Sequence, residues 1–181
     1  MRKNIFMTLV FLTGTITLST FSNAQNTREL YINEVGGDDC NQGTKDHPLK
    51  TLNEAAERVN RANGKGAMTI YIAEGIYGLD ATATFHPVNW HLTRDERLII
   101  RAEVLPDDDG WHPGRMPVII CTMPLDFKMY GNPDPLGGAA YGIQIETSHV
   151  TVQGLRVLGT PVVERPGEGM VRRAYPIVRE G

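Results

Sequence analysis

Three consecutive carboxylates, Asp107, Asp108 and Asp109, form the densest acidic cluster in the sequence. Carboxylate oxygens are the ligands that Ca²⁺ prefers in proteins, so this segment is a candidate calcium site. Adjacent residues cannot all point the same way, however, and the ligand spacing of an EF-hand loop is absent. A solvated turn that binds no metal is therefore the alternative interpretation.

Aromatic and basic side chains elsewhere in the chain could recognise a sugar. Trp111 could stack on a sugar ring through its apolar face, as could Trp90 and Tyr130. Arg172 and Arg173 could bind a glycan carboxylate through two parallel hydrogen bonds. The alternatives are aromatic residues that pack their loops against the protein and a pair of exposed turn charges. We take Trp111, Arg172 and Arg173 as candidate substrate-binding residues, and the sequence identifies no catalytic residue.

The cysteines and histidines carry weaker signals. Cys40 lies in a polar loop and Cys121 ends an apolar stretch, so a disulfide is permitted, with a small buried residue as the alternative for Cys121. Neither has a histidine or a second cysteine at metal-ligand spacing, which argues against a zinc site. A glycosidase pair is not identifiable either, because the separation of its two carboxylates is spatial. Three histidines in polar loops, His86, His91 and His112, have no partner at a recognisable spacing, and His149, at the start of a predicted strand, is interpreted as structural.

The N-terminal segment has the pattern of an export signal. Arg2 and Lys3 precede an uncharged, mostly apolar stretch over residues 5–21, and Ser22-Asn23-Ala24 then places small residues where signal peptidase requires them. We predict cleavage after Ala24 and a secreted or periplasmic protein. A membrane anchor is the alternative, disfavoured because threonine, serine and glycine interrupt the stretch. No later stretch has the length of a membrane span.

Length and charge restrict the classes of partner. The chain has 181 residues, 41% of them hydrophobic, which is typical of a folded protein with a buried core. Its 18 basic and 21 acidic residues give a net charge of -3, and loss of the two basic residues of the leader makes the mature chain more acidic. This charge gives no electrostatic reason to expect nucleic acid or an anionic membrane as a partner.

One helix is predicted shortly after Pro48. Thr51 is placed as its N-cap and Glu54 follows three residues later, a capping box in which each side chain accepts a hydrogen bond from a free backbone N–H of the first turn. Gly64, after Asn63, supplies a left-handed stop. Apolar residues recur at helical spacing, so one face of the helix should cover another element. They are Leu52, Ala55, Ala56, Val59 and Ala62.

Downstream of the helix the hydrophobic period changes to two, which predicts strands. No second helix pattern occurs, so a doubly wound α/β fold is disfavoured and the chain is predicted to be all-β. Strand centres recur every 20 to 30 residues or so, as in a solenoid of stacked coils with unequal loops, whereas a β-sandwich, the alternative, would show turns more often. The predicted strands are 30–33, 68–72, 97–101, 117–121, 142–146, 149–152 and 155–158.

Motifs on both sides of the helix match the pattern of a known family. They are Tyr31-Ile32-Asn33, Gly36-Gly37-Asp38, Asn41-Gln42-Gly43-Thr44, His47 to Leu52 with Ala55, Ile70 to Tyr77, Gly142 to Ile145, and Ser148 to Val157. The first five resemble the start of right-handed parallel β-helix proteins of the pectate-lyase-like superfamily, and the last two resemble one of their interior coils. After the predicted signal peptide at 1–24, the resemblance implies a strand, loop and capping α-helix at 25–67 and β-helix coils at 68–181.

The resemblance also implies a function. Family members that act on polysaccharides are mostly lyases or hydrolases of acidic glycans that bind in a groove along the solenoid, and the lyases use Ca²⁺ or a basic group to neutralise a uronate carboxylate. We therefore expect a secreted polysaccharide-active protein, a lyase or a glycosidase, with a non-catalytic carbohydrate-binding or adhesion protein as the alternative. The strand-like end at 174–181 has no cap. It predicts an N-terminal fragment of a longer protein, without a complete active site, and self-association through the open end.

Overall fold

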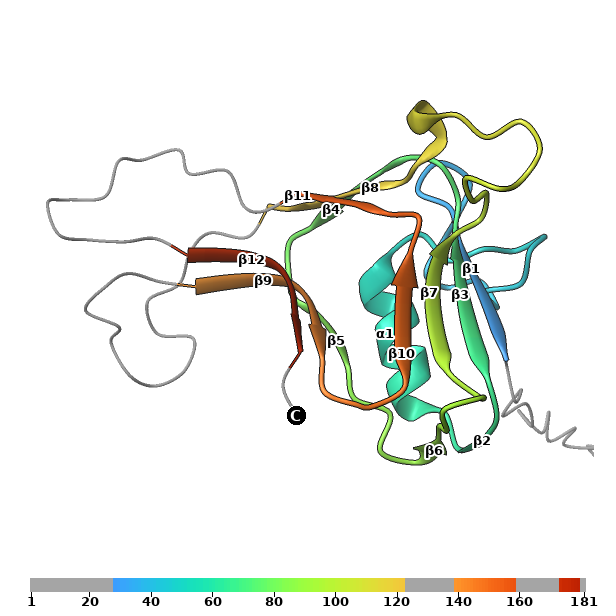
Figure 1. The fold of residues 1–181 in the computed structure, drawn as a ribbon, viewed down its shortest axis with the longest axis vertical. Helices are drawn as coiled ribbons and strands as arrows, with labels where there is room; N and C mark the ends of the chain where they lie inside the picture. Colours follow the sequence, from blue (N-terminus) through green and yellow to red (C-terminus); the bar gives the residue numbers. More distant parts are fainter. Residues whose placement is uncertain (1–27, 123–138, 159–172, 180–181) are drawn as a thin grey trace, which may run out of the picture.

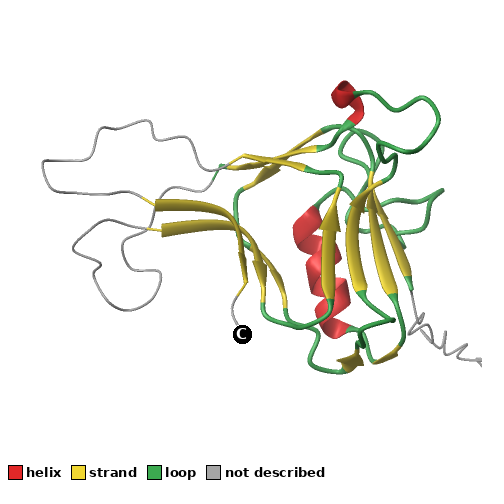
Figure 2. Ribbon diagram, viewed as in Figure 1, coloured by secondary structure: helices red, strands yellow, loops and turns green. Residues whose placement is uncertain are grey.

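The computed structural model describes residues 28–122, 139–158 and 173–179. These residues are mostly strand, with one α-helix, α1 (Leu52–Arg61), and a short 3-10 helix at Pro113–Arg115 (Figure 2). The prediction of a mainly β chain with one helix is confirmed. The predicted signal peptide at 1–24, Tyr130 and Arg172 lie outside the described residues.

Three parallel sheets make up most of the described structure. Their strands are β1 (Glu29–Ile32), β3 (Met68–Ile72), β4 (Ile76–Leu79), β5 (Ala83–Phe85), β7 (Leu98–Ala102), β8 (Val118–Cys121), β9 (Ala139–Ile145), β10 (Val150–Gln153), β11 (Arg156–Leu158) and β12 (Arg173–Arg179). The sheet orders are β1-β3-β7-β10, β4-β8-β11 and β5-β9-β12, and a small fourth sheet pairs β2 (Gly64–Lys65) with β6 (Trp90–His91). Three successive passes of the chain therefore each give one strand to each large sheet (Figure 1).

All the strand pairings in these sheets are parallel. A β-sandwich is built from antiparallel sheets, so the alternative architecture does not account for this pairing. The predicted strands are present with shifts of at most three residues at their ends. The two-residue strands β2 and β6 were not predicted, and neither were β4 and β5. Strands β4 and β5 have only three or four residues and contain glycine or alanine, so pairing with β8 and β9 decides their conformation rather than local propensity.

The alternation of side chains explains how the interior is filled. Successive residues of a strand point to opposite faces of its sheet. In β3, Met68, Ile70 and Ile72 are buried, whereas Thr69 and Tyr71 are half-buried on the other face. The parallel register repeats this choice from strand to strand, so the inward-facing apolar residues form rows that merge into one core.

The helix α1 covers the core at the end of the molecule where β1 lies. It packs against β1, β4 and β5 and lies within the outline of the three sheets in Figure 1. Its apolar face is buried as predicted. The buried residues are Leu52, Ala55, Ala56 and Val59.

The N-terminus of α1 is capped as predicted in one half only. The Thr51 hydroxyl oxygen accepts a hydrogen bond from the backbone N–H of Glu54 at 3.1 Å, so the predicted N-cap is confirmed. The other half of the predicted capping box, in which the Glu54 side chain accepts a hydrogen bond from the N–H of Thr51, is wrong. The N–H of Thr51 donates to the Asp39 carboxylate instead, and the Glu54 carboxylate accepts a hydrogen bond from Arg58. A carboxylate from the preceding loop thus takes the donor that the sequence pattern assigned to Glu54.

The predicted left-handed stop at Gly64 is wrong. The helix ends at Arg61, and Ala62 is its C-cap in an extended conformation. Gly64 opens β2, where its N–H donates to the carbonyl oxygen of Asn89 at 3.0 Å. Pairing of β2 with β6 therefore determines the backbone at Gly64, beyond the end of the helix.

The two cysteines lie in different environments. Cys40 is exposed in the loop before α1, and Cys121 is buried at the end of β8. No disulfide joins them, and the alternative interpretation of Cys121 as a small buried residue is confirmed.

Candidate functional site

The outer face of the sheet β1-β3-β7-β10 carries two rows of side chains in matched register, which we call the ladder face. The members of each row lie directly opposite one another on neighbouring strands, so each row runs across the sheet. Their neighbours along each strand point into the core, which leaves the rows partly open to solvent. The rows are Glu29, Thr69, Ile99 and Thr151, and Tyr31, Tyr71, Arg101 and Gln153.

The tyrosines of the ladder face form a stack. The ring centroids of Tyr31 and Tyr71 are 4.8 Å apart with an angle of 17° between the planes, and the Arg101 guanidinium carbon lies 5.5 Å from the Tyr71 centroid. Because β3 lies between β1 and β7, Tyr31 and Arg101 cover opposite faces of the Tyr71 ring. A sugar would therefore meet the ring edges and hydroxyl groups of this stack rather than the face of Tyr71.

The Tyr31 hydroxyl is a hydrogen-bond donor on this surface. It donates to the Glu29 carboxylate at 3.3 Å. Partial burial and then the negative charge of Glu29 raise the pKa of Tyr31, so the phenol stays protonated at neutral pH.

Two guanidinium groups flank Ile99 on the ladder face. Arg97 and Arg101 are four residues apart on and just before β7, so alternation places both on the outer face, with about 13 Å between their Cα atoms at 3.3 Å per residue. Arg97 donates from Nε to the Thr151 hydroxyl at 2.7 Å and from Nη2 to the Val150 carbonyl oxygen at 2.6 Å. These contacts hold the side chain in place and use only part of its five N–H donors.

Arg101 is held in a similar way. Its Nε donates to the Ala102 carbonyl oxygen at 3.0 Å, and its Nη2 lies 3.6 Å from the Asp108 carboxylate. Positioned guanidinium groups with donors to spare bind carboxylates through paired, charge-assisted hydrogen bonds. The ladder face therefore combines two fixed cations with hydroxyl groups and aromatic edges.

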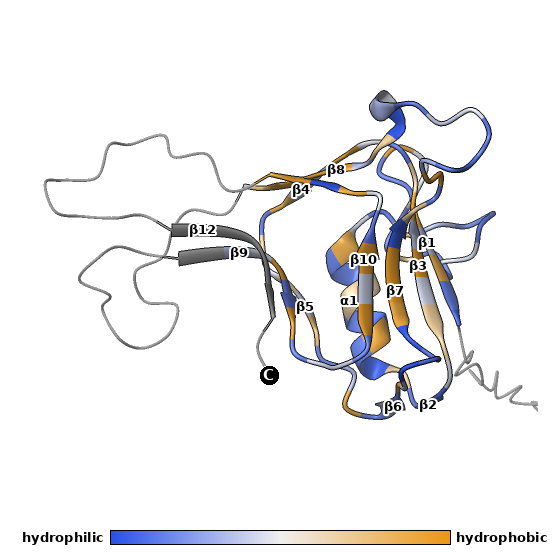
Figure 3. Cartoon of the chain, in the orientation of Figure 1, coloured by the Kyte–Doolittle hydropathy of each residue, from blue (hydrophilic) through white to orange (hydrophobic). Residues whose placement is uncertain are grey.

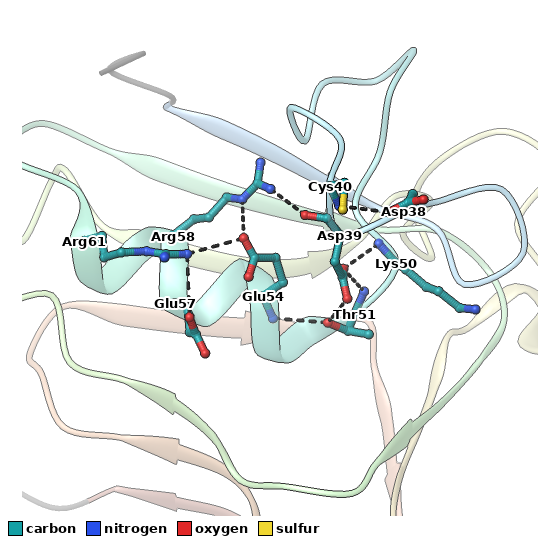
Figure 4. Close-up of polar contacts among 9 residues, drawn as sticks. All are labelled: Asp38, Asp39, Cys40, Lys50, Thr51, Glu54, Glu57, Arg58 and Arg61. Carbon is teal, nitrogen blue, oxygen red and sulfur yellow. Dashed lines mark hydrogen bonds and ion pairs between the residues drawn. The ribbon is translucent and has the colours of Figure 1, made fainter. Parts of the chain in front are cut away.

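The densest polar cluster lies elsewhere, between α1 and the loop before it (Figure 4). The Asp39 carboxylate accepts hydrogen bonds from the N–H groups of Lys50 and Thr51 and from the Thr51 hydroxyl, at 2.8 to 2.9 Å. Arg58 donates to the Asp39 carbonyl oxygen at 2.8 Å and to the Glu54 carboxylate at 2.7 Å. These groups satisfy one another, so the cluster fastens the loop to the helix and is not suited to bind a ligand.

Two groups near the capped end have a raised pKa. A hydrogen bond with the Asp38 carboxylate, and the negative charge of that carboxylate, raise the pKa of the Cys40 thiol, which disfavours the reactive thiolate. Burial raises the pKa of Tyr77 to about 12. The protonated Tyr77 hydroxyl donates to the carbonyl oxygen of Ala73 at 2.9 Å. Both groups therefore fit structural roles.

A second titratable cluster lies where β5 and β9 end. Because Phe85 pairs with Ile145, the following residues His86 and Glu146 are neighbours on successive passes, and His86 Nδ1 lies 3.1 Å from the Glu146 carboxylate. The amide of Gln144 donates to the other oxygen of Glu146 at 2.7 Å. A carboxylate that is itself oriented can orient an imidazole as a proton acceptor.

A pocket of about 420 Å³ lies at the turn between β9 and β10. Its lining combines Ile145, Val150 and Val152, which belong to the core or pack against it, with Arg97 of the ladder face. His149, on its wall, has a φ of 62°, which is unusual for a residue other than glycine. The lining residues are Arg97, Ile145, Thr147, Ser148, His149, Val150 and Val152.

The structure does not bring the predicted calcium ligands together. Asp107, Asp108 and Asp109 are all exposed, and the Asp108 carboxylate accepts a hydrogen bond from the N–H of Leu105 at 2.8 Å besides facing Arg101. Within residues 28–122, 139–158 and 173–179, no group of three or more His, Cys, Asp or Glu residues is placed to hold a metal ion.

The predicted sugar-binding residues have different surroundings. Trp90 is 5% exposed and its indole N–H donates to the Gly66 carbonyl oxygen at 2.7 Å, so it packs its loop against the protein. Trp111 is half-buried, and its indole nitrogen is buried without a hydrogen-bond partner in the described part of the chain. The backbone of Arg173 lies in β12 opposite Ala139, and its side chain is outside the description, as is all of Arg172. The roles of Trp111, Arg172 and Arg173 stay predictions.

The sequence analysis missed the residues of the ladder face. Alternation in 68–72 and 97–101 already indicates that Tyr71, Arg97 and Arg101 point outward. What was missing is the register that sets Tyr31 beside Tyr71 and Tyr71 beside Arg101, because pairing between distant strands is not encoded locally.

The described residues include no helix of the length and apolarity that crossing a membrane requires. Comparisons of the chain with protein-family models, with curated proteins and with solved structures found no match.

Proposed function

We propose that the chain is a right-handed parallel β-helix of the pectate-lyase-like kind, in which the three sheets are the sides of stacked coils. The proposal is supported by the sheet orders, since β3-β4-β5, β7-β8-β9 and β10-β11-β12 follow one another along the chain and pair in parallel. Parallel crossover connections are right-handed in nearly all proteins. α1 is then the cap of the first coil, and residues 1–24 are the signal that exports the protein.

On this fold, the ladder face is a binding surface for an acidic polysaccharide. The observation that carries the proposal is the pair of fixed guanidinium groups, Arg97 and Arg101, on one open sheet face. Each can bind a carboxylate, while hydroxyl groups such as those of Thr69 and Thr151 can bind sugar hydroxyls in the same rows. Rows in register across a parallel sheet form a regular surface, which suits a linear polymer with a regular repeat.

The test is a titration of the full chain with a defined oligomer of uronic acid and with a neutral oligosaccharide of the same length. We expect calorimetry to detect binding of the acidic oligomer that weakens with added salt, because the contacts are charged and partly exposed. Arg97→Gln and Arg101→Gln should each weaken binding about tenfold, the effect of losing one charge-assisted contact of roughly 1.5 kcal/mol.

The matched control is Arg156→Gln. Arg156 also lies on a strand and is more exposed than Arg97 and Arg101, but it belongs to β11, outside the ladder face. Its substitution should leave the affinity unchanged. Absence of binding to any acidic oligomer, or equal losses for all three arginine variants, would overturn the proposal.

Cleavage of the polysaccharide by a lyase or a glycosidase is a second candidate function, favoured by the oriented His86–Glu146 pair. An imidazole held by a carboxylate is suited to remove a proton. Incubation with uronate polymers, with Ca²⁺ or with a chelator, should then release unsaturated products or new reducing ends, and His86→Gln should abolish the release. Absence of product under both conditions would overturn this second candidate.

A further inference from the structure

The sheet β4-β8-β11 is apolar on both faces. Its inward residues, such as Leu79 and Ile119, belong to the core, as the stacking of passes requires. Its outward residues are also apolar apart from Arg156, although they face away from the core. We call this outward surface the β8 face. It consists of Ile76, Gly78, Val118, Ile120 and Leu158.

The β8 face is exposed in the part of the chain that the structure describes. Ile76 is 64% exposed and Leu158 43% exposed, and Val118 and Ile120 between them are half-buried. Figure 3 shows the hydrophobic colour along much of β4 and β8. Parallel sheets normally have both faces covered, and contiguous apolar surface on a folded protein marks an interaction site.

The ladder face provides an internal comparison. It is also the outer face of a parallel sheet, but its outward positions are mainly polar or aromatic, and Ile99 is the one aliphatic residue in its two rows. An outer sheet face that stays in contact with water is therefore built in this protein from mostly polar and aromatic outward residues. The apolar choice on the β8 face calls for a partner surface that excludes water.

Two unlike charges border the β8 face at diagonally opposite corners. Arg156 begins β11 in the row of Val118 and Ile76, and Asp80 follows β4 two residues beyond Gly78 on the same side of the strand. Both are exposed, and neither forms an ion pair among the described residues. Arg115, in the 3-10 helix before β8, is already paired with Glu74 at 3.1 Å.

We propose that the β8 face binds the β8 face of a second copy of this chain. Arg156 and Asp80 lie at opposite ends of one diagonal of the β8 face, and we place a two-fold axis in the interface along the other diagonal. Rotation about this axis sets Arg156 of each copy opposite Asp80 of the other, so the ion pair forms twice. The strands of the two sheets then cross at nearly a right angle, which is one of the two common geometries for packed sheets. Charge complementarity thus selects a second copy as the occupant.

Gly78 has no side chain, so it leaves space on the β8 face that a side chain of the partner can occupy. A Cβ at this position would meet only the Thr122 methyl group, at 3.8 Å, so the surface is open there between Ile76 and Asp80. An aliphatic side chain of the partner can enter this hollow, as in other packed sheets whose side chains interdigitate.

The test is analytical ultracentrifugation of the full chain over a range of concentrations. We expect a reversible dimer, and Ile76→Asp should raise its dissociation constant at least a hundredfold. The matched control is Val88→Asp, because Val88 is 68% exposed, close to Ile76 in exposure, but lies in the loop before β6, away from the β8 face. Circular dichroism verifies that each variant is folded.

A charge exchange tests the orientation without altering the apolar surface. Arg156→Glu and Asp80→Lys alone should each weaken the dimer about tenfold, and the double variant should restore it. A monomer at every concentration would overturn the proposal, as would a dimer that Ile76→Asp leaves intact. A dimer broken by Val152→Asp instead would place association at the last strands of the sheets and also overturn it. Failure of the double variant to recover would overturn the proposed axis.

Discussion

Ile100 and Val152 occupy the same position in neighbouring strands of one sheet, yet only Ile100 is fully buried. The two residues are opposite each other in β7 and β10, and both point inward. Ile100 is 0% exposed because β7 lies between β3 and β10, whereas Val152 is half-buried in the last strand of the sheet order. Ile119 and Val157 repeat the contrast in β8 and β11. The strand pattern therefore decides which face a residue takes, and the next strand decides how completely it is buried.

The opposite end of the same sheet shows that a strand at the end of the order can be covered by other means. Leu30, in β1, lies in the same row as Ile100 and is 2% exposed. α1 and the loop before it cover this end, and Gly37 permits the loop to close, since a Cβ there would overlap the carbonyl oxygens of Asn33 and Leu49. The polar contacts of Asp39 and the apolar face of α1 together cover β1, and the neighbouring strand β10 covers β7 in the same way.

Truncation of Ile100 and of Val152 to alanine should give the largest difference in the free energy of unfolding between β7 and β10. Ile100→Ala removes a fully buried side chain that neighbours on both sides cannot replace, and should lower the free energy of unfolding by about 3 kcal/mol. Val152→Ala removes a half-buried side chain and should lower it by less than about 1 kcal/mol, since water already contacts the site. Urea unfolding followed by circular dichroism measures both values.

If Val152→Ala costs as much as Ile100→Ala with an unchanged dependence on urea concentration, the last strand is covered in solution as fully as β7. Val152→Thr provides a check, because a hydroxyl of similar volume is tolerated only where water reaches it.

Removal of the Asp39 side chain should have the next largest effect and should act at the capped end alone. Asp39→Ala leaves the N–H groups of Lys50 and Thr51 without their acceptor, which should lower the free energy of unfolding by about 2 kcal/mol. Amide hydrogen exchange should increase in the loop and the first turn of α1 and stay unchanged in β10. Asp46→Ala is the control, because Asp46 is exposed in the same loop and has no hydrogen bond or ion pair among the described residues. Equal effects of the two changes would contradict the role given to Asp39.

The fold was predictable from sequence to the extent that local patterns determine it. The period of two in 68–72 and 97–101 and the apolar face of the helix correspond to β3, β7 and α1. The short strands β4 and β5 have weak propensities of their own and form because they pair with β8 and β9. Their positions therefore depend on contacts between distant residues, which a single sequence does not reveal.

The candidate site was less predictable for the same reason. Asp107, Asp108 and Asp109 stand out in the sequence because they are adjacent, yet the structure uses Asp108 to hold a turn and to face Arg101. Tyr31, by contrast, has no signal until the register of β1 and β3 stacks it on Tyr71. Clusters that arise from stacked strands are invisible to spacing along the chain.

The smallest expected effects are those of Thr51→Ala and Glu54→Ala, the two residues of the predicted capping box at α1. Thr51→Ala removes the acceptor of the Glu54 N–H and should lower the free energy of unfolding by about 1 kcal/mol. Glu54→Ala removes only partly exposed ion pairs with Arg58 and Arg61 and should cost less than about 0.5 kcal/mol, because alanine also favours the helix. A reciprocal capping box would make the two losses similar, since each residue would then satisfy one backbone N–H. Paired urea unfolding curves distinguish the cases, and a Glu54→Ala loss as large as that of Thr51→Ala would mean that Asp39 does not take the place of Glu54 at the Thr51 N–H in solution.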